Sequence, residues 1–427
     1  MLKSVAFIIY YQKETIFSMN AIAAALETDK TTRSVDIIFI REKNRLLKEI
    51  NSVLKTHEIV IIGFSIFTTQ FWEISEIIKK IRKKYRNKVI IIAGGPHPSG
   101  MPKQTLNLGV NVVFIGESEK SIIKFIKQLQ KGAIYQDIKG IASFNQDKTF
   151  IYNKKDYIID LNQFPPFPLL NTRFGTIEIT RGCPYLCHFC QTPFIMGVNP
   201  RYRNIKTICK YIKLMKKENL TDIRFIAPNA FSYGSIDGKS VNIEKLENLL
   251  SEVRNIIGAE GKVFFGSFPS EVRPEHVNDN TLELIKQYTD NENIIIGAQS
   301  GSQRMLDFCH RGHKVKHIYE AVKKTIQRGL EANVDFIFGL PNERKKDRHT
   351  TLQVMKDLIE IGAKIHAHTF MPLPNTPFAR SSVTKIDKTT RSFLKEYNFR
   401  GYVYGNWNKQ EKLGNKISEL LRNNLNN

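Results

Sequence analysis

Residues 181–190 read RGCPYLCHFC and place Cys183, Cys187 and Cys190 in the spacing C-x3-C-x2-C. The chain has five cysteines in 427 residues, so most of its thiols are concentrated in this one short stretch. Structural metal sites usually take four protein ligands, whereas catalytic sites leave one coordination position open. Three clustered thiols therefore indicate a metal site whose last position is kept for a ligand that is not protein.

Three interpretations of the cysteine group are open from the residues alone. His188 could complete a Cys3His zinc site, but structural zinc sites usually divide their ligands into two separated pairs, and a second pair is missing. The cysteines could also lack any ligand. The interpretation that we favour is a [4Fe–4S] cluster held by three thiolates, with one iron free of protein ligands. The remaining cysteines, Cys209 and Cys309, stand alone and are read as small buried apolar residues.

A strand–helix rhythm surrounds the cysteine group. Apolar strand candidates with helical stretches between them lie at 175–180, 222–227, 262–268, 293–299, 334–340 and 365–371. Repeated βα units form barrels with chemistry on the loops at the carboxyl ends of the strands, and six units are fewer than a closed barrel needs. We therefore predict a partial, TIM-like (β/α)6 barrel over 171–385, with the cysteines on the loop after its first strand.

A second α/β domain is predicted before the barrel. Continuous Val/Ile-rich runs occur at 4–10, 35–40, 59–66, 89–95 and 110–117. Such runs are typical of parallel strands that are buried on both faces, and helical segments between them indicate a doubly wound, Rossmann- or flavodoxin-like sheet. We assign 1–130 to this domain, 131–170 with its proline-rich end to a linker, and the polar stretch 386–427 to a C-terminal extension.

The charge balance suggests acidic partners. The chain has 64 Lys and Arg against 41 Asp and Glu, a net charge of +23, and two basic runs, 79–88 and 201–217, contain no acid. The runs are read first as solvated helix faces and second as a surface for nucleic acid. There is no signal-peptide pattern and no apolar run of membrane-spanning length, so we expect a cytoplasmic protein without a membrane span.

The cysteine group, with the aromatic Phe189 just before its last member, resembles the radical S-adenosylmethionine (SAM) enzymes, and the resemblance extends over 171–380. It implies a cluster whose open iron binds SAM, and an electron donor such as ferredoxin or flavodoxin that triggers cleavage to a 5′-deoxyadenosyl radical. It also implies that Phe189 lies near the adenine, that Gln299 and Ser300 lie along SAM, and that Glu271 and Arg273 are further contacts. Two departures are Gln299, where the family often has an acid, and the stretch APNAF (227–231), where it has a Gly-Gly-Glu turn.

The N-terminal domain resembles the cobalamin-binding domain that precedes many radical SAM domains. The matching stretches 17–27, 63–70, 94–100 and 116–121 occur in the expected order. The resemblance implies cofactor contacts from Thr68, Gly94, Gly95, His97, Gly116 and Glu117. The D-x-H-x-x-G motif that supplies a histidine to cobalt is absent, so either no protein histidine binds cobalt or the domain has lost the cofactor. We interpret His97 as a loop histidine rather than a metal ligand, and Thr68 also as a helix cap.

Together the two resemblances imply a cobalamin-dependent radical SAM enzyme, and most simply a methyltransferase. In such an enzyme the radical removes a hydrogen atom from an unactivated carbon of a small-molecule or biosynthetic-intermediate substrate. Methylcobalamin then delivers the methyl group to that carbon. Cobalamin-assisted rearrangement or ring contraction is one alternative. An RNA-binding or RNA-modifying protein is the other, motivated by the basic runs.

Overall fold

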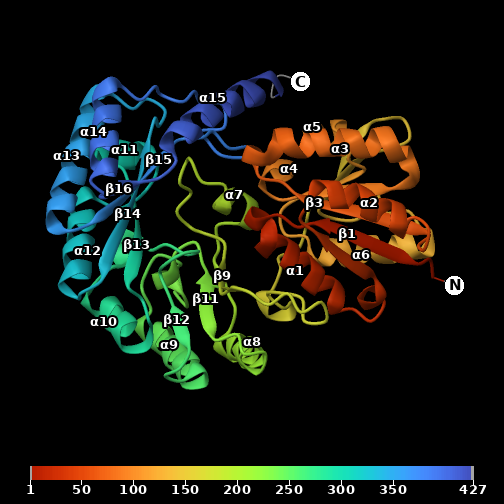
Figure 1. The fold of residues 1–427 in the computed structure, drawn as a ribbon, viewed down its shortest axis with the longest axis horizontal. Helices are drawn as coiled ribbons and strands as arrows, with labels where there is room; N and C mark the ends of the chain where they lie inside the picture. Colours follow the sequence, from red (N-terminus) through yellow and green to blue (C-terminus); the bar gives the residue numbers. More distant parts are fainter. Residues whose placement is uncertain (1, 425–427) are drawn as a thin grey trace. The chain divides into compact units, whose positions relative to one another are not determined.

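A computed structural model of the chain describes residues 2–424 and divides it into two compact units, Met1–Gly175 and Thr176–Asn427 (Figure 1). The first unit holds the domain predicted over 1–130 together with the expected linker. The second holds the predicted barrel together with the expected C-terminal extension. Each unit has its own sheet system and is described by itself.

The first unit is built on a seven-stranded sheet of order β2-β1-β3-β4-β5-β6-β7. Its strands are β1 (Val5–Tyr10), β2 (Asp36–Ile40), β3 (Ile59–Ser65), β4 (Ile90–Gly94), β5 (Val112–Phe114), β6 (Ile141–Phe144) and β7 (Phe150–Tyr152). The first five are parallel, and β6 and β7 add an antiparallel edge. The order 2-1-3-4-5 is the flavodoxin-like doubly wound arrangement, in which ligands bind at the carboxyl ends of the strands beside the β1/β3 switch point.

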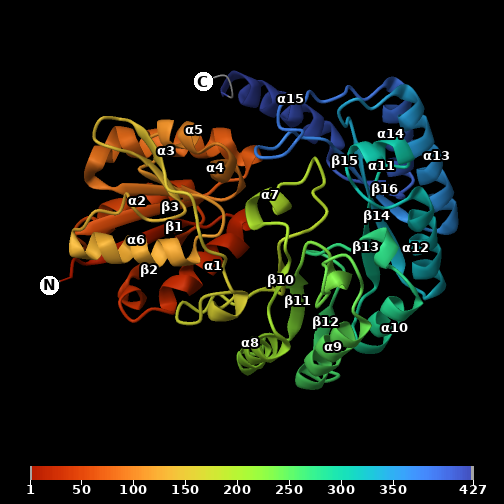
Figure 2. The ribbon, with the colours of Figure 1, turned by 180° about the vertical axis from the view of Figure 1, so that it is seen from behind.

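Helices cover both faces of this sheet, as predicted. Helices α2 (Lys43–Val53) and α3 (Phe71–Tyr85) bury side chains against one face, and α1 (Ile16–Glu27) and α6 (Glu119–Lys131) against the other (Figure 2). The apolar residues of α3 recur at helical spacing, and Ile74, Ile77, Ile78 and Ile81 are all buried. The Val/Ile-rich strands are thus buried on both sides, which explains why their sequences do not alternate.

The stretch 131–170 differs from the expected linker because it is part of the first unit. Its strands β6 and β7 form a hairpin that pairs with β5. The proline-rich end is held by the Glu27 carboxylate, which accepts hydrogen bonds from the backbone N–H groups of Leu169, Leu170 and Asn171 at 2.6, 2.9 and 3.0 Å. Because the partner of these N–H groups is more than a hundred residues away in sequence, local pattern alone indicated a linker.

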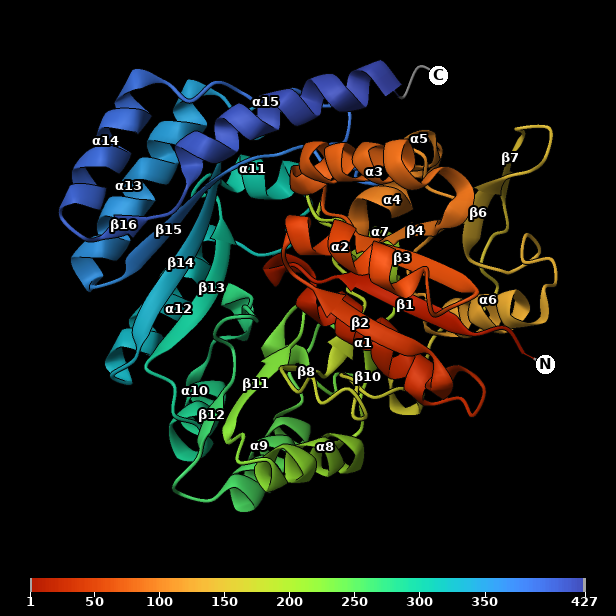
Figure 3. The same cartoon turned by 45° about the vertical axis from the view of Figure 1, so that its right-hand side comes forward.

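The second unit is an open series of parallel strands. They are β8 (Ile177–Glu178), β11 (Asp222–Ile226), β12 (Lys262–Phe264), β13 (Asn293–Gln299), β14 (Glu331–Phe338), β15 (Lys364–Thr369) and β16 (Val403–Tyr404). They pair as β12-β11-β8 and β13-β14-β15-β16 (Figure 3), and an isolated parallel bridge links Ile296 of β13 to Val272 in the segment after β12. The six predicted βα strands are all present, and the C-terminal extension adds β16 as a seventh.

Helices surround the outer side of this strand series. They are α8 (Ile205–Lys217), α9 (Ile243–Ile257), α10 (Asp279–Tyr288), α11 (Gln303–Phe308), α12 (Val315–Gln327), α13 (Lys345–Ile361), α14 (Lys388–Phe399) and α15 (Trp407–Asn424). On β14, Val334 and Phe336 are fully buried, whereas Asp335 between them is on the opposite face and partly exposed. We call the face turned away from α12 and α13 the inner face of the strand series.

The two basic runs lie mainly on helices α3 and α8, and the lysines of both runs are exposed. This agrees with their interpretation as solvated helix faces. Within residues 2–424, no helix combines the length and apolar character that a membrane crossing requires.

Candidate functional site

The three cysteines lie on a loop between the short strands β9 (Thr180–Arg181) and β10 (Arg201–Tyr202), which pair antiparallel. The loop is closed at its base by a hydrogen bond from the Cys183 N–H to the Gly197 carbonyl, at 3.0 Å. Gly182 has φ +95°, and a Cβ there would lie 2.8 Å from the Asn199 carbonyl oxygen. Glycine is therefore required immediately before the first cysteine.

The cysteine loop is anchored to two other segments. The His188 N–H donates to the Cys309 carbonyl at 3.0 Å, and the Phe378 N–H donates to the His188 carbonyl at 3.2 Å. Nδ1 of His310 lies 2.8 Å from the Tyr185 carbonyl oxygen, and the His310 ring stacks on that of His188. Through these contacts His188 helps to hold the loop in place. The zinc interpretation had instead assigned His188 the role of a metal ligand.

The three thiols suit a cluster with one open iron. Burial raises the pKa of Cys183 and raises that of Cys190 to about 11, so both need a nearby positive charge to ionise. A bound iron–sulfur cluster would supply that charge: each thiolate would bind one iron of a [4Fe–4S] cluster, and the fourth iron would be left for another ligand. Cys187 also accepts a hydrogen bond from Nη1 of Arg311, at 3.6 Å.

Arg311 is a site residue that the sequence reasoning missed. It lies inside the range 171–380 over which the chain resembles the family, but nothing in its sequence spacing distinguishes it from other arginines. Its Nη2 donates to the Gly297 carbonyl at 2.7 Å, and its side chain is buried. Burial opposes its charge, but the Cys187 sulfur and the Glu271 carboxylate outweigh that effect and raise the pKa of Arg311. It therefore places a fixed positive charge beside the cysteine group.

Gly297 makes room for the side chains around Arg311. A Cβ at Gly297 would lie 2.6 Å from Nη2 of Arg311, 2.9 Å from Nε2 of Gln299 and 3.1 Å from Oε2 of Glu271. The structure thus brings two of the predicted SAM contacts, Glu271 and Gln299, together with Arg311 around one glycine. Burial raises the pKa of Glu271, while Arg311 acts in the opposite direction.

We expect Gly297→Ala to lower the free energy of unfolding by about 1–3 kcal/mol, because the added methyl group overpacks this position and displaces the Arg311 guanidinium. Chemical denaturation measures the change. Gly175→Ala is the matched control, since its Cβ would meet only Nδ2 of Asn20, at 3.9 Å. Equal stability of the two variants would contradict the close packing inferred at Gly297.

Arg273 supports the cysteine loop, and its contact with SAM remains a prediction. It is buried, its guanidinium lies over the Tyr185 ring with Cζ 3.4 Å from the centroid, and its Nε donates to Oε1 of Glu275 at 2.6 Å. The backbone N–H of Arg273 donates a hydrogen bond to Oδ1 of Asn229, 3.1 Å away. Asn229 is the central residue of the APNAF stretch. The APNAF stretch therefore helps to hold the segment that contains Arg273.

The last two predicted SAM contacts, Phe189 and Ser300, lie in different surroundings. Phe189 is half-buried and packs against an apolar cluster of Met305, Cys309, Leu340, Phe370 and Phe378. Ser300 is buried, its Oγ lies 3.3 Å from Oγ1 of Thr351, and it accepts a hydrogen bond from the Ser302 N–H at 3.2 Å. The hydroxyl of Ser300 is thus used within the fold. The contacts of both residues with SAM remain predictions.

In the first unit, the predicted cobalamin contacts gather at the carboxyl ends of the strands. Gly94 ends β4, and Gly95 has φ +94°, where a Cβ would lie 2.8 Å from Oγ of Ser65. The Gly116 N–H donates to Oγ of Ser99 at 3.0 Å. Glu117, next to it, is buried with Nζ of Lys155 3.4 Å from its carboxylate. Glycines at these strand ends allow the backbone to approach a large flat ligand closely.

Both ring nitrogens of His97 are engaged within the first unit. Nδ1 lies 3.3 Å from Oγ1 of Thr68, and Nε2 lies 2.9 Å from Oε1 of Gln104. The side chain is fully buried, and burial lowers its pKa to about 4. This environment supports the interpretation of His97 as a structural histidine, and its contact with cobalamin remains a prediction.

We expect His97 to make the protein less stable in mild acid. The unfolded chain, with the ordinary histidine pKa near 6.5, takes up a proton between pH 7 and pH 5, whereas the folded chain does not, so unfolding becomes easier by about 2 kcal/mol. His97→Gln should remove this component and retain cobalamin binding. Denaturation at the two pH values measures it. The same pH dependence in both proteins would contradict the buried neutral ring, and loss of cobalamin from the folded variant would contradict its structural role.

Comparisons with known proteins agree with both units. The family model of the Radical SAM superfamily matches residues 177–355, and that of the B12 binding domain matches residues 10–125. An uncharacterized methyltransferase of Pyrococcus horikoshii is 22% identical over 323 residues, which are 73% of this chain and 67% of that protein. The tRNA-2-methylthio-N(6)-dimethylallyladenosine synthase of Buchnera aphidicola is 28% identical over 356 residues, 80% of this chain and 73% of that protein.

Among solved structures, the fold is similar to that of the radical SAM methyltransferase TsrM from Kitasatospora setae, determined with cobalamin and a [4Fe–4S] cluster bound. The TM-score is 0.70 at 13% identity, over 89% of this chain and 74% of that one. The predicted fold of both units is thus confirmed. The chain belongs to the radical SAM superfamily and carries an N-terminal B12-binding domain, and its cofactors are a [4Fe–4S] cluster, SAM and cobalamin.

Proposed function

We propose that this protein methylates an unactivated carbon of a small-molecule or biosynthetic-intermediate substrate in the cytoplasm, with electrons from a donor such as ferredoxin or flavodoxin. The observation that carries the proposal is the presence of a three-thiol loop in a radical SAM unit together with a B12-binding unit in the same chain. When bound, the cluster and SAM supply a 5′-deoxyadenosyl radical, and cobalamin supplies a methyl group.

The chain's own residues provide position and charge for this chemistry. Cys183, Cys187 and Cys190 hold the cluster, and the anchored loop keeps its open iron in one place. Arg311 donates a hydrogen bond to Cys187, and hydrogen bonds to cluster sulfurs adjust the reduction potential. Glu271 and Gln299 lie beside Gly297 on the side of Arg311, where the SAM contacts are expected.

We favour methyl transfer over transfer of a methylthio group, although several relatives are named as methylthiotransferases or methylthio-adenosine synthases. Insertion of sulfur needs a sulfur donor, and a second iron–sulfur cluster would need further thiolate ligands. Outside the cysteine loop, the chain has only Cys209 on α8 and Cys309 after α11, and both are buried. They do not form a second ligand group.

Mass analysis of the product with SAM labelled in its methyl group tests the proposal. The expected result is a product that carries the labelled methyl group on carbon, together with 5′-deoxyadenosine. A product without label would contradict methyl transfer and would support cobalamin-assisted rearrangement or ring contraction. A product that gains sulfur would contradict the argument from the cysteine count.

RNA is the second candidate substrate, because the net charge is +23 and the lysines of α3 and α8 are exposed. A filter-binding titration with RNA at several salt concentrations distinguishes it from a small molecule. Micromolar binding that weakens steeply with salt would support RNA, since phosphate contacts release counterions. Absence of binding at low salt would remove this candidate.

A further inference from the structure

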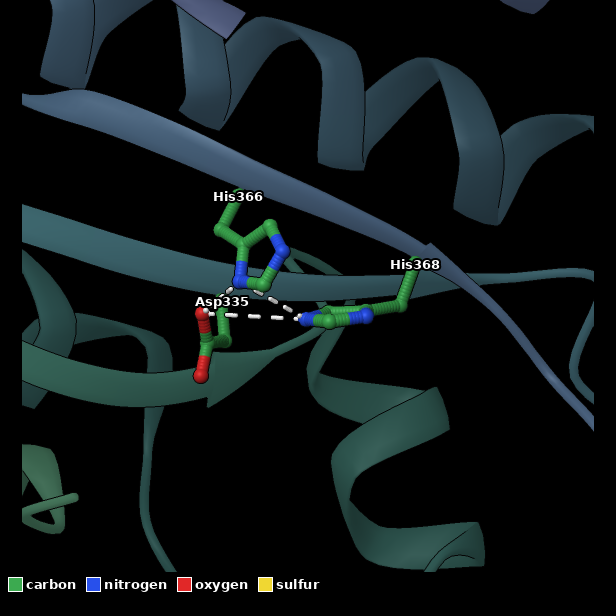
Figure 4. A group of neighbouring side chains, drawn as sticks. All are labelled: Asp335, His366 and His368. Atoms are coloured by element: carbon green, nitrogen blue, oxygen red, sulfur yellow. Dashed lines mark hydrogen bonds and ion pairs between the residues drawn. The ribbon is translucent and has the colours of Figure 1, made fainter. Parts of the chain in front are cut away.

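Three side chains of metal-binding types converge on the inner face of the second unit (Figure 4). Asp335 on β14 pairs in register with His366 on β15, and His368 lies two residues further along β15. Because side chains alternate between the faces of a strand, all three project from the same face. Tyr404 of β16 stacks on the His366 ring with centroids 4.5 Å apart and holds it in place.

The three donor atoms are spaced as the ligands of one metal ion. Oδ1 of Asp335 lies 3.1 Å from Nδ1 of His366 and 3.8 Å from Nε2 of His368, and the two imidazole nitrogens are 3.0 Å apart. The point equidistant from these atoms lies about 2 Å from each of them, which is the length of a zinc–nitrogen or zinc–oxygen bond.

Hydrogen bonds alone do not satisfy all three of these contacts. A ring nitrogen carries either one hydrogen or one lone pair, so Nδ1 of His366 cannot donate to Asp335 and accept from His368 at the same time. A cation at the centre accepts all three lone pairs together.

We propose that Asp335, His366 and His368 bind a divalent first-row metal ion that is separate from the iron–sulfur cluster. Two histidines and one carboxylate are a ligand set of catalytic zinc and non-haem iron sites, which keep positions open for other ligands. The side chains of His366 and His368 are 31% and 28% exposed, so an ion and an oxygen ligand can reach them.

The ion is placed to bind an oxygen-bearing substrate group such as a carboxylate, carbonyl or phosphate. Glu271 lies beside Gly297 together with Arg311, and besides burial, the nearby Asp335 carboxylate helps to raise the pKa of Glu271. The metal group and the cysteine-loop side chains therefore share the inner face of one unit. Binding of the ion itself does not rest on the proposed methyl transfer.

Gln410 on α15 offers a way to strengthen the proposed site. Its Oε1 accepts a hydrogen bond from the Thr369 N–H at 2.8 Å, so its amide nitrogen faces Nδ1 of His368, 3.3 Å away. A metal-bound His368 carries its hydrogen on Nδ1, and such histidines usually donate it to an oxygen. In Gln410→Glu, one carboxylate oxygen can keep the Thr369 contact while the other accepts from His368.

Equilibrium dialysis of the reconstituted full-length protein against Zn²⁺, followed by elemental analysis, tests the proposal. Iron content reports the cluster and zinc content reports the new site, so failure of one is distinguishable from failure of the other. We expect about one zinc ion per chain, weakening of at least ~10-fold in Asp335→Asn and His366→Gln, and tightening of about 10-fold in Gln410→Glu. His349→Gln, an exposed histidine on α13, is the control and should bind as the parent does.

Three results would overturn the proposal. The first is the absence of zinc binding in protein with full iron content, which would mean that the group holds a proton only. The second is zinc binding that persists unchanged in Asp335→Asn and His366→Gln. The third is a Gln410→Glu variant that is folded and binds zinc no more tightly than the parent. Thermal unfolding of each variant establishes that it is folded.

Discussion

Cys187→Ala is expected to remove the [4Fe–4S] cluster and to reduce SAM cleavage by more than about 100-fold, because loss of a direct ligand should exceed the 10–100-fold cost of losing an outer-shell partner. Cys187 is buried, it receives the hydrogen bond of Arg311, and its carbonyl accepts from the Cys190 N–H. The same outcome is expected for Cys183 and Cys190. Iron and sulfide content, paramagnetic resonance after reduction, and 5′-deoxyadenosine formation measure it.

Cys209→Ala is the matched control for these variants. Cys209 is also buried, but it lies on α8 and belongs to no ligand group. The variant should keep its iron and its activity. A full complement of iron in Cys187→Ala would contradict the assignment of the cluster ligands, and loss of iron in Cys209→Ala would show that the cluster responds to general destabilisation.

Arg311→Leu is expected to lower the free energy of unfolding by about 3 kcal/mol, because it leaves the Glu271 carboxylate without its cationic neighbour in a buried site. It should also make the reduction potential of the cluster more negative. The hydrogen bond to Cys187 stabilises the reduced, more negatively charged cluster, and the variant lacks it. Chemical denaturation measures the first effect, and a redox titration followed by paramagnetic resonance measures the second.

Two further variants separate the effect on the free energy of unfolding from the effect on the reduction potential. Arg311→Leu combined with Glu271→Gln should recover part of the stability but not the potential, because it removes the unpaired charge without restoring the donor. Arg328→Leu breaks an exposed ion pair with Glu283 and should cost less than about 1 kcal/mol. An unchanged potential in Arg311→Leu would contradict a role for this residue at the cluster.

Much of the fold was predictable because it depends on local pattern. Continuous Val/Ile runs with helices between them predicted the parallel strands of the first unit, and the βα rhythm predicted six strands of the second. Both patterns arise from burial on two faces of a sheet, which acts on every residue of a strand. The domain boundary was less predictable, because β6 and β7 are short and the Pro-rich segment is held by Glu27 from a distant helix.

The candidate site likewise combines residues that the sequence made evident with residues that only the fold brought together. Cys183, Cys187 and Cys190 were evident from the sequence, since ligands on one loop keep a fixed spacing along the chain. Arg311 became evident only when folding placed it beside Cys187, and Gly297 acquired its meaning from the three side chains that surround it. In the first unit, the sequence suggested that His97 is no metal ligand, and the structure supplied the reason in its buried contacts with Thr68 and Gln104.

By itself, the sequence determined the class of fold and the order of the two units, and it pointed to the three thiols as cluster ligands, because periodicity and short-range spacing carry that information. Only the tertiary structure decided which distant residues meet. Asp335 and His368 are separated by more than thirty residues and lack a ligand spacing between them, yet the parallel register of β14 and β15 brings their donor atoms to 3.8 Å. Strand register depends on the packing of the whole sheet, and this long-range condition has no local pattern in the chain.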